Sequence, residues 1–188
     1  MRYSHSHTQG YSLVEVLVAI SILMLSIVGP ITIAAKSLQS AQYVRQQNTA
    51  FFLAQEGISI ANTLRNDGAL DAVINGDVGS WEWVSNSALA PCFTSTGCDI
   101  DFRDKTLTSN VVDCSDSADA CTLRYDADAS RAMFQHSSGD ASIYTRKLTF
   151  VFATSDEVKV TSDVSWATPL LGGTQTVSLS TSLFNIYK

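Results

Sequence analysis

The stretch from Thr8 to Gly29, TQGYSLVEVLVAISILMLSIVG, decides the fold of this chain. A polar leader ends at Gly10, and an apolar run begins directly after it. From Tyr11 to Ala35 the only charged side chain is that of Glu15. As a helix this run would be about 37 Å long, enough to cross a hydrocarbon core of about 30 Å. The sequence therefore predicts a membrane-spanning helix with a carboxylate near its start.

The leader does not have the pattern of an ordinary secretory signal. Such a signal has a basic start, a shorter apolar region and a small-residue cleavage site. Here only Arg2 and two histidines can supply positive charge before the apolar run. A signal-peptidase site near Ile33-Ala34-Ala35 stays open as an alternative.

The presence of the Glu15 carboxylate in an apolar membrane segment needs an explanation. A carboxylate in a membrane segment is unfavourable by up to a few kcal/mol, and by less near the interface. The default inference is therefore a function with a charged partner. The alternative is that the side chain simply reaches the polar interface from its shallow position.

The residues Gly10 to Val16, GYSLVEV, resemble the processing site of type IV prepilins and pseudopilins. In that family a membrane-embedded prepilin peptidase cuts after the glycine and methylates the new N-terminus. The resemblance implies a cut between Gly10 and Tyr11, although the family usually has Phe where this chain has Tyr11. It also implies an assembly role for Glu15, because the family's glutamate pairs with the N-terminal amine of a neighbouring subunit.

The amino-acid composition and net charge limit the classes of partner that this chain can bind. The chain has 188 residues, a net charge of −6 and a pI of about 4.8. An acidic chain lacks the basic patch that nucleic-acid binding requires, so we expect no nucleic-acid partner. The same balance argues against docking on anionic lipid head groups. The residues after the apolar run are enough for one domain with its own core.

Four cysteines fall in the middle of the chain, at Cys92, Cys98, Cys114 and Cys121. Their spacings are not the C-x2-C of zinc or redox motifs. In an exported domain, disulfides are the expected state. Four cysteines allow three pairings, and we favour Cys92–Cys98 with Cys114–Cys121 because each closes a short polar loop.

The helix is predicted to continue beyond the membrane. Gly29-Pro30 should kink it, because proline removes a backbone donor and clashes with the preceding turn. The segment FFLAQEGI then resembles the second helical half of the pilin family. We expect the helix to end at Asn66-Asp67-Gly68 and Glu56 to lie on a solvated face. Apolar positions at helical spacing predict a stripe that covers a sheet, formed by Ala50, Leu53, Ala54, Gly57, Ile58, Ala61 and Leu64.

The last third of the chain has the period of strands. In one run Tyr144, Leu148, Phe150 and Phe152 share a face, and in the next Val158, Val160, Val164 and Trp166 do so. Thr154-Ser155-Asp156 is short enough to join them as an antiparallel hairpin. A third run places Val177, Leu179 and Leu183 on one face, and weaker strands are expected at Leu123–Tyr125 and Ala132–Gln135. The prediction is an α+β fold, with a long N-terminal helix on an antiparallel sheet, as in pilins.

The sequence offers little material for catalysis. It contains no phosphate-binding loop, nucleophile elbow or HExxH motif, and His136 is the only histidine outside the leader. We therefore predict no enzymatic activity, no cofactor and no metal site. Asp126 to Arg131 begins like a calcium loop, but Arg131 stands where an EF-hand needs glycine. A calcium-binding loop stays open beside the simpler interpretation of a solvated acidic surface.

Together these patterns predict a structural subunit of a type IV pilus or a type II secretion pseudopilus, most similar to minor pilins and I-type minor pseudopilins. The expected parts are a leader (1–10), a transmembrane and assembly helix (11–35), a second helical half (36–68) and a strand-rich extracytoplasmic domain (69–188). The resemblance implies other pilin subunits, the prepilin peptidase, the assembly machinery of the inner membrane and membrane lipid as partners. The alternatives are an anchored extracellular binding domain and a membrane-anchored hydrolase.

Overall fold

The computed structural model describes residues 10, 12–76, 84, 86–101, 110–127, 132–168 and 172–185. The chain divides into two compact units, Met1–Val44 and Arg45–Lys188. One helix, α1 (Leu13–Asn75), runs from the first unit into the second. Everything that follows α1 belongs to the second unit.

In the first unit α1 is an isolated apolar helix. Its most apolar 18-residue window has a mean hydropathy of 2.5, and none of that window is buried. The hydroxyls of Ser21 and Thr32 donate to the carbonyl oxygens of Leu17 and Gly29, each at 2.8 Å. The helix itself thus satisfies these polar groups, as a lipid environment requires. By length and composition, this is a helix that can cross a membrane.

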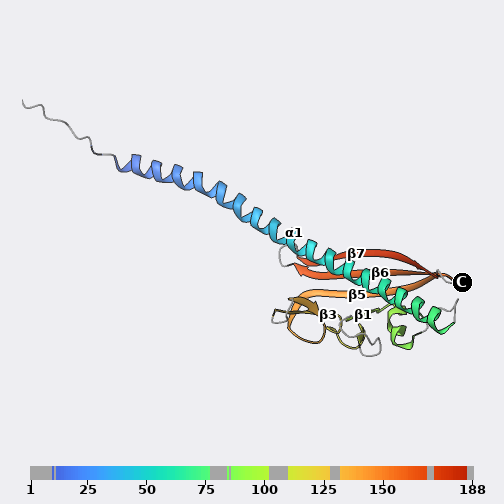
Figure 1. Cartoon of the computed structure of the whole chain (residues 1–188). Coiled ribbons are helices and arrows are strands. Elements are labelled where there is room, and N and C mark those ends of the chain that lie inside the picture. The colour runs from blue at the N-terminus through green and yellow to red at the C-terminus, as the bar shows by residue number, and fades with distance from the viewer. Residues whose placement is uncertain are drawn as a thin grey trace, which may run out of the picture. The chain divides into compact units, whose positions relative to one another are not determined.

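The second unit is a seven-stranded antiparallel sheet with part of α1 across one face (Figure 1). A 3-10 helix, η1 (Ser87–Phe93), leads into the sheet. The strands are β1 (Cys98–Ile100), β2 (Val111–Asp113), β3 (Thr122–Asp126), β4 (Met133–Gln135), β5 (Asp140–Thr154), β6 (Glu157–Thr168) and β7 (Gly173–Phe184).

The long strand β5 organises the sheet. One edge of β5 pairs with β6, which in turn pairs with β7. β5 also pairs with β1, through Cys98 and Leu148, and with β3. The outer strands are completed by β2 on β1 and β4 on β3. This confirms the α+β fold and the β5–β6 hairpin expected from the sequence.

The core lies between α1 and the sheet. Gly57 marks the closest approach, because a Cβ placed there would lie 2.6 Å from Ser162 Oγ and 2.8 Å from Leu148 Cδ2. A glycine lets the helix backbone pack directly on β5 and β6. The buried helix positions are Ala50, Leu53, Ala54, Gly57, Ile60, Ala61, Leu64 and Ala72. The predicted stripe is therefore confirmed, except that Ile60 is buried in it and Ile58 is only partly buried.

The predicted end of the helix is wrong. α1 continues past Asn66-Asp67-Gly68 to Asn75, where Gly76 has a φ of +78°. A glycine in this left-handed conformation is a common way to end a helix. Ala72 is 2% exposed, and its burial in the second unit favours the extra turns over the weak local stop signal. The helix also continues through Pro30.

The strand predictions hold in position and in face. β3 contains the predicted strand Leu123–Tyr125, and β4 begins one residue later than the predicted strand Ala132–Gln135. On β5, Tyr144, Leu148 and Phe150 are buried, while Phe152 is 53% exposed and stacks on Phe93 with ring centroids 5.1 Å apart. The same buried face also holds a residue that the sequence did not flag, Arg146.

Candidate functional site

The described residues of the prepilin-like segment lie at the N-terminal end of α1, where Gly10 and Ser12 precede the first helical residue. Gly10 is exposed, and a Cβ placed on it would meet no other atom within 4 Å. Tyr11 lies outside the described residues. The backbone N–H of Val16 donates to the carbonyl oxygen of Ser12 at 3.1 Å, so the helical bonding starts at Ser12. Gly10 is therefore exposed and lies two residues before the start of the helical bonding.

Glu15 lies in the first turn of α1 and is exposed. Ser12 and Glu15 have the S-x-x-E spacing of a capping box, a local role that the sequence pattern could have suggested. Within the described residues, however, the Glu15 carboxylate forms no hydrogen bond and no ion pair. A helix N-terminus favours a negative charge, but a free carboxylate at this position can still accept a cationic partner.

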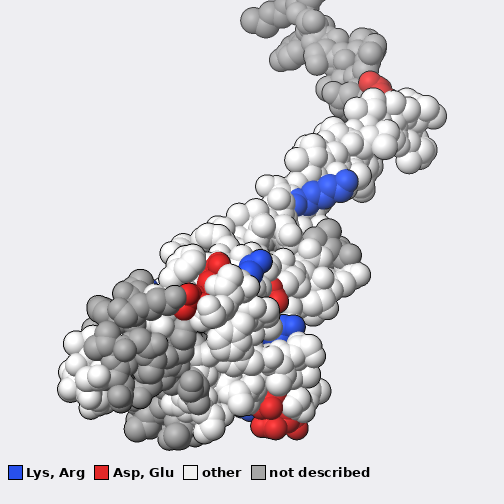
Figure 2. All heavy atoms as spheres, turned by 90° about the vertical axis from the view of Figure 1, so that its right-hand side faces the viewer, with Lys and Arg blue, Asp and Glu red and all other residues white. Residues whose placement is uncertain are grey.

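The apolar side chains that follow Glu15 are exposed as well. Leu17 is 57% exposed, Leu23 60% and Leu25 77%. Figure 2 shows a mostly uncharged surface along the described part of this helix. Such a continuous apolar surface requires lipid or other protein around it.

The cysteines form two local disulfides. Cys92 pairs with Cys98, which joins η1 to β1, and the Cα atoms are 4.6 Å apart. Cys114 pairs with Cys121 across the turn between β2 and β3, with Cα atoms 5.2 Å apart. These are the local pairings that the sequence favours.

A buried ionic network ties α1 to the sheet, and sequence reasoning missed it. The Arg146 side chain of β5 is 4% exposed and that of Asp99 on β1 is fully buried. Arg146 Nε donates to both Asp99 carboxylate oxygens, at 2.8 and 3.0 Å. Arg146 Nη1 donates to Glu56 Oε2 of α1 at 3.0 Å, and Nη2 donates to the Ile100 carbonyl oxygen at 3.3 Å.

His136 completes the network on the other side of Asp99. Its Nε2 lies 2.7 Å from Asp99 Oδ2, and its backbone N–H donates to Asp101 Oδ2 at 3.3 Å. Burial alone would lower the pKa of Arg146, but the negative charges of Asp99 and Glu56 and their hydrogen bonds outweigh it, so this pKa lies above its ordinary value. Arg146 thus stays charged and is compensated inside the fold.

This network corrects the role expected for Glu56. The side chain is 51% exposed, as expected of a solvated face, but it is also the helix's ion-pair partner for Arg146. The sequence pattern that could have indicated this network is the position of Arg146, which lies on the same apolar strand face as Tyr144 and Leu148. The donors and acceptors of this network bond to one another, so its role is structural: it holds α1 against the sheet.

No group of three or more metal-binding side chains comes together in the described part of the chain. Asp126 Oδ2 accepts from Gln135 Nε2 and from Ser138 Oγ, each at 2.8 Å. The rest of the possible calcium loop, residues 128–131, lies outside the described residues. The calcium alternative is therefore still open.

The comparison with known families agrees with the N-terminal geometry. Residues 5–29 match the family model described as the prokaryotic N-terminal methylation motif. This match includes Gly10, Tyr11 and Glu15 together with much of the apolar run. The chain thus carries the motif by which such proteins are processed at their N-terminus. Neither the curated proteins nor the solved structures gave a match.

Proposed function

We propose that this chain is a minor structural subunit of a type IV pilus or a type II secretion pseudopilus. The observation that carries the proposal is the methylation motif at residues 5–29, joined to an exposed apolar helix and an α+β domain. Before assembly, α1 anchors the subunit in the inner membrane with its second unit outside the cytoplasm. After cleavage and methylation, α1 carries the subunit into a filament.

The physical problem of assembly is to exchange lipid for protein around α1. Lipid tails are as apolar as the side chains of a helix, so the exchange itself supplies little driving force or register. A charge pair inside the apolar bundle can supply the register. Glu15 provides the negative charge, and the amine created at Tyr11 of the next subunit provides the positive one. Repeated head to tail, such a contact does not close and forms a filament.

The partners in this proposal are the prepilin peptidase, other pilin or pseudopilin subunits and the assembly machinery of the inner membrane. The subunit acts as a building block and not as an enzyme. Its two disulfides suit an oxidising compartment outside the cytoplasm.

The Gly10→Val variant tests the first step of the proposal. The peptidase must approach the backbone at this point, and the open surroundings of Gly10 permit that approach. A β-branched side chain obstructs it, so we expect cleavage to fall by at least tenfold in cells that express a prepilin peptidase. Immunoblotting separates precursor from mature chain, and Gly29→Val serves as a control because it changes a glycine beyond the cut. Normal processing of Gly10→Val would overturn this mechanism.

A further inference from the structure

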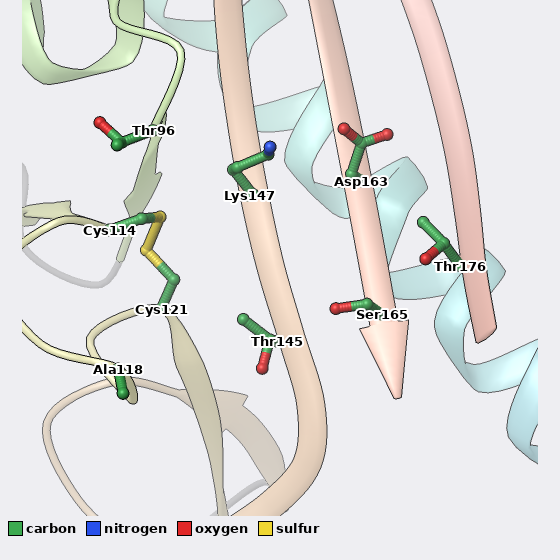
Figure 3. A pocket seen from close by; sticks show the side chains of 9 residues that line it. All are labelled: Thr96, Cys114, Ala118, Cys121, Thr145, Lys147, Asp163, Ser165 and Thr176. Atoms are coloured by element: carbon green, nitrogen blue, oxygen red, sulfur yellow. A yellow bond between two sulfur atoms is a disulfide. The ribbon is translucent and has the colours of Figure 1, made fainter. Parts of the chain in front are cut away.

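A groove of about 430 Å³ lies on the face of the sheet opposite α1 (Figure 3). Its floor is formed by side chains of β5, β6 and β7, and one wall is the turn closed by the Cys114–Cys121 disulfide. Neither the proposed assembly helix nor the buried ionic network uses this face. The lining residues are Thr96, Cys114, Ala118, Cys121, Thr145, Lys147, Asp163, Ser165 and Thr176.

The wall is fixed to the floor independently of any ligand. The backbone N–H of Cys114 donates to the carbonyl oxygen of Gly97 at 3.2 Å. The carbonyl oxygen of Cys121 accepts from the backbone N–H of Arg146 at 3.0 Å. The first bond ties the turn to the residue before β1, the second ties it to β5, and the disulfide closes the turn. A preformed groove binds a ligand without the cost of ordering a loop.

Two opposite charges face each other across the floor. Lys147 on β5 and Asp163 on β6 are direct register partners, and both are half-buried. Within the described residues they form no ion pair, although directly opposed side chains can reach each other. A Cβ placed on Gly97 would lie 2.7 Å from Lys147 Cγ, so the lysine stem lies close against that glycine. The ammonium and carboxylate groups are left available to the groove.

The remaining polar groups are hydroxyls. Thr145 and Ser165 lie beside the two charges, Thr176 lies on β7, and Thr96 lies on the segment between η1 and β1 (Figure 3). The exposed outer face of β7 continues this row beyond the groove with Thr174, Ser178, Ser180 and Ser182.

The polar groups of the groove indicate which chemical class of ligand would be complementary to it. The groove has one donor-only group, one acceptor-only group and several hydroxyls that do both. Its two charges cancel, so it favours a ligand with no net charge. A ligand with many hydroxyl groups can pair with both charged groups and with the hydroxyls, although Thr96 Oγ1 already lies 2.7 Å from Thr94 Oγ1 and Thr145 Oγ1 lies 3.4 Å from Thr122 Oγ1. The uncharged hydroxyl row on β7 suits an extended chain better than a single small zwitterion.

We propose that this groove binds a neutral saccharide chain. Asp163 accepts from sugar hydroxyls, Lys147 donates to sugar oxygens, and the Ser and Thr hydroxyls complete the contacts. Among the described residues that line the groove there is no aromatic side chain to stack on a sugar ring, so we expect weak binding, with a Kd on the order of millimolar. The site gives the exposed domain a recognition role that does not depend on the filament proposal.

The test uses the full chain in phospholipid nanodiscs, because a maltoside detergent would itself present a saccharide. Amide chemical shifts are followed by NMR during titration with cellobiose, with N,N′-diacetylchitobiose and with the zwitterion glycylglycine. We expect saturable shifts at groove residues with at least one disaccharide and no saturation with glycylglycine. Lys147→Gln and Asp163→Asn should each weaken binding by about tenfold, because each removes a hydrogen bond to a charged group.

The matched control is Lys159→Gln, which removes a lysine from the exposed part of β6 outside the groove. It should bind as tightly as the unaltered chain. Three results would overturn the proposal: no saturable shift with either disaccharide up to about 20 mM, equal weakening by Lys159→Gln, or tighter binding of glycylglycine than of both disaccharides. None of these results bears on cleavage at Gly10, so failure here is distinct from failure of the filament proposal.

Discussion

Glu15→Leu is expected to enter the membrane normally and to be lost from filaments. The change removes an unfavourable charge from an apolar segment, so insertion should be equal or easier. The same change takes away the partner of a neighbour's N-terminal amine. An unpaired buried charge typically costs about 3–5 kcal/mol. Because 1.4 kcal/mol is a factor of ten, incorporation should fall by well over tenfold.

The measurement compares sheared filaments with membranes. Glu15→Leu is produced beside the unaltered chain, equal membrane level and cleavage are confirmed, and its fraction in filaments is determined by mass spectrometry. Glu15→Asp should be intermediate, because it keeps the charge but shortens its reach. Ser21→Ala is the matched control, since the Ser21 hydroxyl bonds to the Leu17 carbonyl oxygen of its own helix and needs no partner subunit. Equal incorporation of Glu15→Leu and the unaltered chain would contradict the charge-pair mechanism.

Arg146→Met should destabilise the second unit by about 3–5 kcal/mol. It leaves the fully buried Asp99 without its main cationic partner and removes the ion pair that joins β5 to Glu56 of α1. For a domain of this size, the midpoint of thermal unfolding should fall by roughly 10 °C or more.

Thermal unfolding of the full chain, followed by circular dichroism in nanodiscs, measures this effect. Lys159→Met is the matched control, because Lys159 is exposed on the neighbouring strand, and it should change stability by less than about 0.5 kcal/mol. Adding Asp99→Asn to Arg146→Met should restore part of the loss, since no uncompensated charge then stays buried. If Arg146→Met unfolds at the same temperature as Lys159→Met, the network does not hold the helix on the sheet.

The parts of the fold that local patterns specify were predictable. The apolar run, the alternation along β5, β6 and β7, and the short turn after Thr154 each follow from neighbouring residues alone. The end of α1 was missed because Asn66-Asp67-Gly68 is only a weak stop. A glycine inside a helix costs about 1 kcal/mol, which the tertiary burial of Ala72 can offset.

The buried network and the groove could not be predicted in the same way. Both depend on residues far apart in the sequence that the strand order brings together. Arg146 was visible as a basic residue on an apolar face, but its partners Asp99 and Glu56 come from β1 and α1. The short strands β1 and β2 contain too few residues for alternation to reveal them, and a disulfide helps to fix each.

The mature N-terminus tests the central proposal most directly. The full chain is produced in cells that express a prepilin peptidase, recovered from membranes and from filaments, and analysed by intact mass and N-terminal sequencing. The proposal predicts a chain that begins at Tyr11 and carries one added methyl group on its N-terminal amine. A mature chain that begins near Lys36, or one that retains residues 1–10, would contradict it.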